Sequence, residues 1–133
     1  IEVRKELTDE WKRAGVEEGQ QYASLTNIIT QAWSGKTVGE YKQHKGLHKE
    51  SLRDNMTNLE LTLNTLAEIT TAELHKQNNP QGFRASAKLA KEGGNIAGNT
   101  RKEIESRLGH SVSSSMRASD AILPIEDGEA KKE

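Results

Sequence analysis

Apolar side chains recur every three or four residues along most of the chain, which is the spacing of one face of an α-helix. Over residues 16–33 this face consists of Tyr22, Leu25, Ile29 and Ala32. Gly35 follows at the position where many helices end in the left-handed conformation. The pattern therefore predicts a buried helix over 16–33.

A longer apolar stripe predicts a second helix over residues 58–77. Its seam consists of Leu52, Met56, Leu59, Leu63 and Leu66, with Ile69 continuing it and Leu74 one place out of register. Such a seam packs against a partner helix, so we expect it to form the centre of the core. Pro80 and Gly82 lie in the short polar segment that follows, which predicts a loop.

Hydroxyl residues mark several predicted helix starts. Thr8 is expected to cap a short helix that ends near Gly15. Three more hydroxyl residues have an acid three positions on, as in a capping box: Thr37 with Glu40, Ser51 with Asp54, and Thr57 with Glu60. The first pair predicts a short helix ending near Gly46, the second a turn at Leu52, and the third the start of the long helix.

A last helix is predicted over residues 84–108, although it contains Gly93 and Gly94 and each glycine costs about 1 kcal/mol relative to alanine. Small residues recur there at three or four positions: Ala87, Ala90, Gly94, Ala97 and Gly98. In a continuous helix they form a ridge without side-chain bulk, which another helix can approach closely. We expect this ridge to pack within the chain or across a homodimer; a loop at the glycines is the alternative.

The segment after His110 is rich in serine and charge, a composition too polar to order itself. We therefore expect a helical interaction domain over 1–109 and a flexible tail over 110–133. The predicted fold is all-α, a small helical bundle with a short basic helix pair on one flank. No segment of the sequence predicts a strand.

Composition narrows the classes of function. A length of 133 residues with 32% hydrophobic residues fits one small domain. The net charge of −1 excludes a globally basic binder of nucleic acid or membranes and leaves only local patches. The absence of cysteine excludes disulfides, thiolate metal sites and cysteine nucleophiles.

Targeting signals are also missing from the sequence. No apolar run approaches the roughly 20 residues of a membrane span, and no signal peptide opens the chain, so we expect a cytoplasmic protein. The chain begins at Ile1 without an initiator methionine, so we expect that an N-terminal part is missing.

Positive charge is concentrated in two segments. Residues 34–53 hold five basic and two acidic residues, and residues 84–109 hold six and three, so each has a net charge of +3. The candidate residues for binding DNA or an acidic partner are Lys42, Lys45, Lys49, Arg53, Arg84, Lys88, Arg101 and Lys102. The first segment has the outline of a helix-turn-helix whose lysines would bind phosphates. The composition favours the alternative, a small subdomain with solvated lysines.

The sequence shows no constellation for catalysis or metal binding. Residues 34–37 contain the Gly-Lys-Thr that ends a phosphate-loop motif. However, Thr30 stands where the motif has its leading glycine, and the preceding segment predicts a helix where the motif requires a strand. His44 and His48 are spaced like metal ligands, but a glycine lies between them and no third ligand follows at a familiar spacing. We therefore expect no enzyme, metal, cofactor or small-molecule substrate.

Several short segments occur in an order and spacing that mark a known family. They are Leu7-Thr8-Asp9-Glu10-Trp11-Lys12, Gly15-Val16, Glu40-Tyr41-Lys42, Lys45-Gly46-Leu47, Leu52-Arg53-Asp54-Asn55-Met56-Thr57, Gly82-Phe83 and Gly93-Gly94-Asn95-Ile96-Ala97-Gly98-Asn99-Thr100-Arg101-Lys102. Over residues 4–109 the chain thus resembles the C-terminal half of the bacterial DNA-damage-inducible protein D family.

This resemblance implies a context for the chain. In that family a domain related to phage and viral BRO-type antirepressors usually precedes this region. The resemblance implies a cytoplasmic role in the SOS response or in mobile-element regulation, acting on recombination machinery or DNA transactions without catalysis. It supplies no catalytic residue.

We therefore expect a non-enzymatic regulatory interaction module that forms a homo-oligomer and has recombination proteins or DNA as partners. The alternative is a direct DNA-binding, helix-turn-helix-like protein of a phage or mobile element, whose two basic segments converge in space.

Overall fold

The computed structural model describes residues 2–118 of the chain. Its elements are α1 (Glu2–Arg13), α2 (Gln20–Ser34), α3 (Val38–His44), the 3-10 turn η1 (Arg53–Asn55), α4 (Asn58–Asn78) and α5 (Gly82–Leu108). No strand occurs among these residues, so the predicted all-α class is confirmed. Every helix within 2–118 is too short or too polar to cross a lipid bilayer.

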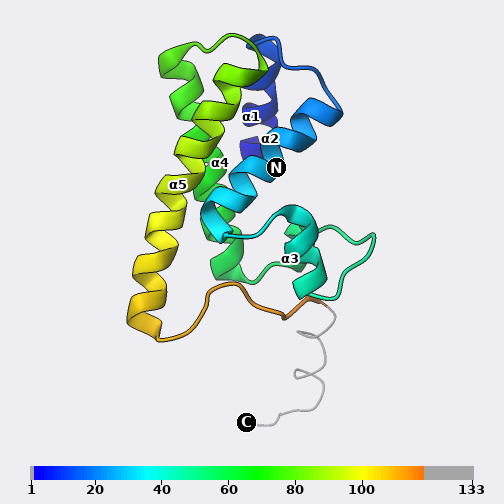
Figure 1. Cartoon of the computed structure of the whole chain (residues 1–133), viewed down its shortest axis with the longest axis vertical. Helices are drawn as coiled ribbons and strands as arrows, with labels where there is room; N and C mark the ends of the chain where they lie inside the picture. The colour runs from blue at the N-terminus through cyan, green and yellow to red at the C-terminus, as the bar shows by residue number, and fades with distance from the viewer. Residues whose placement is uncertain (1, 119–133) are drawn as a thin grey trace.

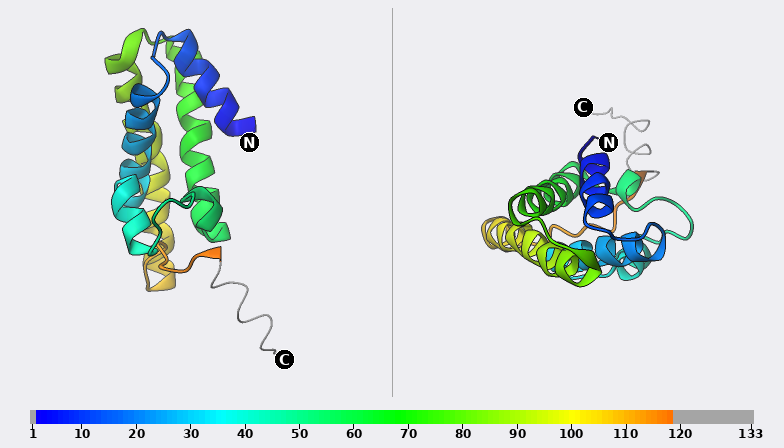
Figure 2. Two further views of the ribbon diagram at one scale, coloured as in Figure 1. Left: turned by 90° about the vertical axis from the view of Figure 1, so that its right-hand side faces the viewer. Right: turned by 90° about the horizontal axis from the view of Figure 1, so that it is seen from above.

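The four long helices surround a common core. α5 packs against both α2 and α4, α1 lies against α4, and α3 joins the flank of α2 (Figure 1). In the view from above, α1, α2, α4 and α5 form a ring (Figure 2). Fully buried side chains that fill its interior include Trp11, Leu25, Ile29, Trp33, Tyr41 and Leu63.

Two of the three predicted capping boxes are complete. The hydroxyl of Thr37 accepts the backbone N–H of Glu40, and the Glu40 carboxylate accepts the N–H of Thr37. Thr57 and Glu60 make the same pair of bonds at the start of α4. Ser51 accepts one N–H, and only the turn η1 follows it. The basic flank is therefore one helix and one turn, not a helix-turn-helix.

The predicted start of the first helix is wrong. α1 extends back to Glu2, and the Thr8 hydroxyl lies within it and donates to the carbonyl of Lys5. A threonine caps a helix only where the preceding backbone leaves that helix. Here Leu7 and Trp11, four residues apart, are both fully buried, and the helix continues across Thr8 to bury them.

α2 also begins later than the apolar pattern predicts. It starts at Gln20 instead of residue 16, because Gly19 has a φ of 86°, outside the helical region. Its predicted end is confirmed, since Gly35 takes a left-handed φ of 82° and donates its N–H to the carbonyl of Gln31.

The leucine seam of α4 is not the centre of the core. Leu63 is buried, but Leu59 and Leu66 are only half-buried and Ile69 is 39% exposed. The buried face is turned away from this seam and carries mainly polar residues: Glu60, Asn64, Glu68, Thr71 and His75. Because α1, α2 and α5 cover that face and supply partners for several of these groups, such as the Trp33 indole for Asn64, polar residues are buried there.

α5 runs without a break through its glycines. Neighbouring helices pack so closely on these glycines that they occupy the space a side chain would need. A Cβ on Gly93 would lie 2.1 Å from the Thr71 Oγ1 of α4. A Cβ on Gly94 would lie 2.5 Å from the Ala32 Cβ of α2, and one on Gly98 would lie 2.6 Å from the Ala32 carbonyl oxygen. The buried ridge members are Ala90, Gly94, Ala97 and Gly98. The ridge therefore packs within the chain and offers no surface to a second copy.

The chain beyond α5 returns to the bundle instead of leaving it at the predicted boundary, residue 109. The C-terminal segment, residues 111–118, crosses the lower end of the bundle toward α3 (Figure 1). Val112 is 5% exposed, and the N–H of Ser114 donates to the Glu60 carboxylate over 3.0 Å. This segment is ordered because the bundle supplies hydrogen-bond partners that the segment lacks by itself. The rest of the predicted tail, 119–133, lies outside the described residues.

His75 makes the stability of the bundle depend on pH. Its side chain is 1% exposed, and neither ring nitrogen has a hydrogen-bond partner among the described residues. Burial lowers the pKa of His75, and the nearby Glu10 carboxylate opposes this shift without cancelling it. The unfolded chain therefore binds this proton at a higher pH than the folded chain does. The free energy of unfolding should fall as the pH drops below about 6.5.

We expect the urea midpoint of the protein to decrease between pH 7 and pH 5. The decrease should be smaller in His75→Leu, which removes the titrating group and fills its place with an apolar side chain. Equal decreases in the two proteins would show that another group controls this part of the pH profile.

Candidate functional site

A basic groove lies between α2 and α5. It has a volume of about 770 Å³, and its lining includes Ile28, Gln31 and Ala32 of α2 and the residue that ends this helix, Gly35. The cationic residues of the groove all come from α5: Arg84, Lys88, Lys91, Arg101 and Lys102. None of the acidic residues within 2–118 lines it.

Helical periodicity aligns the cations of this groove. Arg84, Lys88, Lys91 and Asn95 follow one another at intervals of four, three and four residues, so their side chains share one face of α5. Lys102 lies five helical turns beyond Arg84 and returns to that face. The row spans 18 residues, or about 27 Å at 1.5 Å per residue.

Four of the five cations are exposed and have no ion pair or hydrogen bond with the described residues: Arg84, Lys88, Lys91 and Lys102. The three acids of α5 do not line the groove. Glu103 pairs with Arg107, Glu105 pairs with Arg101, and Glu92 makes no ion pair with residues 2–118. The groove therefore presents uncompensated positive charge along most of α5.

Arg101 has a different role from the other four. Its Nε donates to the Trp33 carbonyl over 2.6 Å, and its Nη1 donates to the Glu105 carboxylate over 2.7 Å. Burial raises the pKa of Glu105, but the N–H of Val112 and the Arg101 guanidinium outweigh it and hold the pKa below its ordinary value. Arg101 thus joins α5 to the end of α2, and only 15% of its side chain is exposed.

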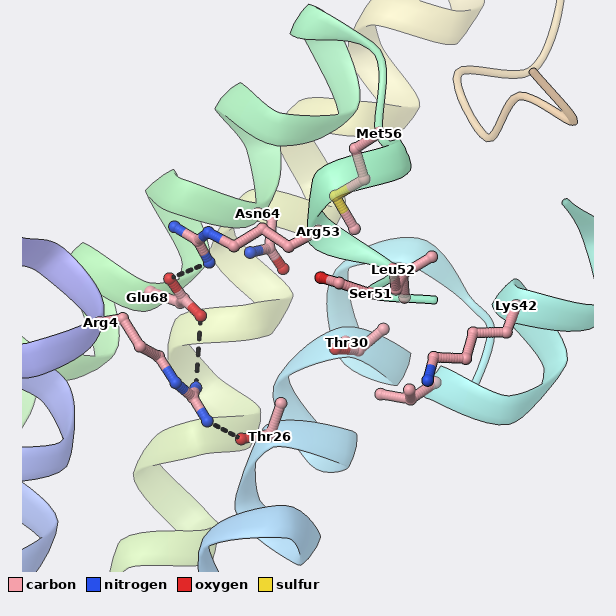
Figure 3. A pocket seen from close by; sticks show the side chains of 11 residues that line it. Arg4, Thr26, Thr30, Lys42, Ser51, Leu52, Arg53, Met56, Asn64 and Glu68 are labelled. Atoms are coloured by element: carbon pink, nitrogen blue, oxygen red, sulfur yellow. Dashed lines mark hydrogen bonds and ion pairs between the residues drawn. The ribbon is translucent and has the colours of Figure 1, made fainter. Parts of the chain in front are cut away.

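The first basic segment does not extend this groove. Lys42 and Arg53 line a separate pocket, which also includes Thr26 and Thr30 of α2 (Figure 3). Those threonines lie on the side of α2 opposite Ile28, Gln31 and Ala32, as the helical period of 3.6 requires. The two basic segments therefore face different sides of α2 and form no single patch.

The other two lysines of the first segment have unlike surroundings. Lys45 cannot contact a partner, because its side chain is 0% exposed and its ammonium lies 2.8 Å from the Glu60 carboxylate. Lys49 is exposed in the loop after α3. Of the eight candidate cations, the structure brings Arg84, Lys88, Arg101 and Lys102 together, and it adds Lys91, which the sequence prediction omitted. Its spacing from Lys88 and Arg84 is the signal that identifies it.

The segment that resembles a phosphate loop and the histidine pair that resembles a metal site have other surroundings in the structure. Gly35 ends α2 and Thr37 caps α3, so the segment resembling a phosphate loop is a helix–helix junction. His44 and His48 are both exposed, and the Nε2 of His44 lies 3.4 Å from the Ser113 carbonyl oxygen. Within residues 2–118 no three His, Asp or Glu side chains are grouped as metal ligands.

Comparisons of this chain with models of protein families, with curated proteins and with solved structures find no match. The family resemblance described from the sequence therefore stays a prediction.

Proposed function

We propose that this chain is a non-enzymatic module that binds the sugar–phosphate backbone of duplex DNA in the groove between α2 and α5. One observation carries the proposal: four exposed cations without partners among the described residues form a row on α5, in a groove that no acid of residues 2–118 lines. Lysine and arginine bind phosphates by releasing condensed counterions from the nucleic acid, and this works locally even when the net charge is near zero.

The lining of the groove favours a duplex over a single strand. Proteins that hold single strands stack the bases on aromatic side chains, and no aromatic residue of the described part of the chain lines this groove. Gln31 and Asn95 add neutral amides that can donate to phosphate oxygens. The row of about 27 Å matches about eight base pairs at 3.4 Å each. With few groups to read base edges, the binding is expected to be independent of sequence.

The wider role is part of the same proposal. On the basis of the family resemblance, we propose that such a module acts in the bacterial cytoplasm, in the regulation of DNA transactions after damage. The ridge of α5 is covered by α2 and α4, so a recombination protein or second copy must use another surface. The exposed cationic row is better suited to a macromolecular partner than the ridge is.

The salt dependence of binding tests this proposal. Anisotropy titrations of the whole chain with a labelled duplex at several salt concentrations should give a log–log slope of about −3.6 for four phosphate contacts. In Lys88→Gln/Lys91→Gln the slope should shrink to about −1.8, with weaker binding at each salt concentration.

Lys12→Gln/Lys49→Gln is the matched control, since it removes the same charge at exposed lysines outside the groove. It should keep the slope of the unaltered protein. A control that lowers the slope as much as the groove variant would mean that net charge, not this groove, binds the duplex. Protein recognition would replace DNA binding as the proposed function if the chain does not bind the duplex, or if neither salt nor any of these variants changes its binding.

A further inference from the structure

We infer that the pocket among α1, α2, α3, η1 and α4 is a second binding site, for a small organic molecule with a dianionic group, such as a phosphate monoester, on an apolar body. The pocket has a volume of about 480 Å³ and lies where these elements meet (Figure 3). Small-molecule sites in proteins usually measure about 300–1,000 Å³. This inference does not rest on the proposed DNA binding, which uses the opposite side of α2.

The charged residues of the pocket leave a surplus of two positive charges. Three cations, Arg4, Lys42 and Arg53, line the pocket, and Glu68 is the one carboxylate of residues 2–118 that lines it. Lys42 reaches from α3 and has no ion pair with the described residues (Figure 3). A dianionic group would balance this surplus, whereas a cationic or neutral ligand would leave it uncompensated.

Glu68 holds the two arginines in place. The carboxylate is only 4% exposed and accepts the Nη1 of Arg53 over 3.0 Å and the Nη1 of Arg4 over 3.4 Å (Figure 3). The Nη2 of Arg4 also donates to the Thr26 hydroxyl over 2.7 Å. Because a guanidinium has five N–H donors, both arginines retain donors for a ligand while their positions are fixed.

Neutral groups in the pocket add further donors. Asn64 is 7% exposed, and its Oδ1 accepts the Trp33 indole N–H over 3.1 Å. That bond fixes the orientation of the amide and leaves the Nδ2 donors without an acceptor among the described residues. Thr30 is 3% exposed, and its hydroxyl makes no hydrogen bond with residues 2–118. A ligand that accepts hydrogen bonds would satisfy these groups, as an anionic oxygen does.

The remaining wall of the pocket is apolar. Val38, Leu52 and Met56 line it, and most of the exposed lining surface is contributed by apolar atoms. A bare inorganic anion would leave this wall in contact with water. A ligand with an apolar body covers it, so the site should prefer an organic phosphate to phosphate itself.

Phenyl phosphate is the probe for this site, with inorganic phosphate and phenol as partial analogues. Titrations of the whole chain followed by amide chemical shifts should show phenyl phosphate binding about tenfold or more tightly than either analogue. Lys42→Gln should weaken phenyl phosphate about tenfold, the loss expected for one charge-assisted hydrogen bond. It should fold normally, because Lys42 has no structural partner within residues 2–118.

Two controls locate the binding. Lys49→Gln removes the same charge outside the pocket, and Lys88→Gln/Lys91→Gln removes charge from the α5 groove. Both should bind phenyl phosphate as the unaltered protein does. The inference is overturned if phenyl phosphate fails to bind, if inorganic phosphate binds equally well, or if the groove variant weakens binding as much as Lys42→Gln. Loss of duplex binding alone, with phenyl phosphate retained, would contradict only the proposed DNA function.

Discussion

Gly93→Ala is expected to destabilise the bundle by about 3 kcal/mol, at the upper end of the cost of overpacking a core. The added Cβ would lie 2.1 Å from the Thr71 Oγ1 and 2.9 Å from the Thr71 Cα and backbone nitrogen. The Thr71 hydroxyl cannot move aside freely, because it donates to the Ala67 carbonyl. The Thr71 backbone atoms are part of α4, so they can move away only if the whole helix shifts. α4 and α5 must therefore separate.

Gly39→Ala is the matched control for this prediction. Gly39 is exposed in α3, and a Cβ there would meet no atom within 4 Å. The same substitution should stabilise the protein by about 0.5–1 kcal/mol, the ordinary advantage of alanine over glycine in a helix. Urea unfolding of both variants measures the two effects. If Gly93→Ala proved as favourable as Gly39→Ala, α4 and α5 would not approach as closely as the structure indicates.

Glu60→Ala should cost about 3–5 kcal/mol, because it leaves a buried ammonium without its counterion. The side chains of Lys45 and Glu60 are both 0% exposed, and the ion pair between them is 2.8 Å long. The same carboxylate accepts the Tyr41 hydroxyl and the backbone N–H groups of Thr57 and Ser114. Its removal therefore breaks contacts among α3, α4 and the C-terminal segment at once.

Glu40→Ala separates the buried charge from the helix cap. Glu40 occupies the same position in the capping box of α3 but is exposed, so its loss should cost only about 1 kcal/mol. The difference between the two variants in urea unfolding measures the buried network. Similar losses in both would contradict a structural role for the Lys45 pair.

The buried network also predicts the effect of acid. Burial raises the pKa of Glu60, but bonds from Lys45, Thr57 and Tyr41 outweigh it, and the folded pKa lies below the ordinary value of 4.5. The contribution of Glu60 is therefore complete above about pH 4.5 and is lost as the pH falls through the folded pKa. This acid loss should be reduced in Glu60→Gln.

The sequence alone determined the features that depend on neighbours within one or two helical turns. The boxes at Thr37 and Thr57, the glycine that ends α2 and the absence of strands follow from such local interactions. The row of cations on α5 is also readable from spacing once the helix is assigned. Capping bonds and helical periodicity require no knowledge of where the other helices lie.

Only the tertiary structure decided which of these helical faces are covered. A leucine seam is the expected core of α4, yet the buried face carries Glu60, Asn64 and Glu68, because distant side chains supply their partners. From the sequence Lys45 is expected to be a surface cation, but in the structure its side chain is buried and pairs with Glu60, fifteen residues later. The two basic segments face opposite sides of α2, and this follows from where α3 and α5 pack on that helix. Burial and charge compensation depend on contacts between residues far apart in the chain, and a local pattern contains no record of those contacts.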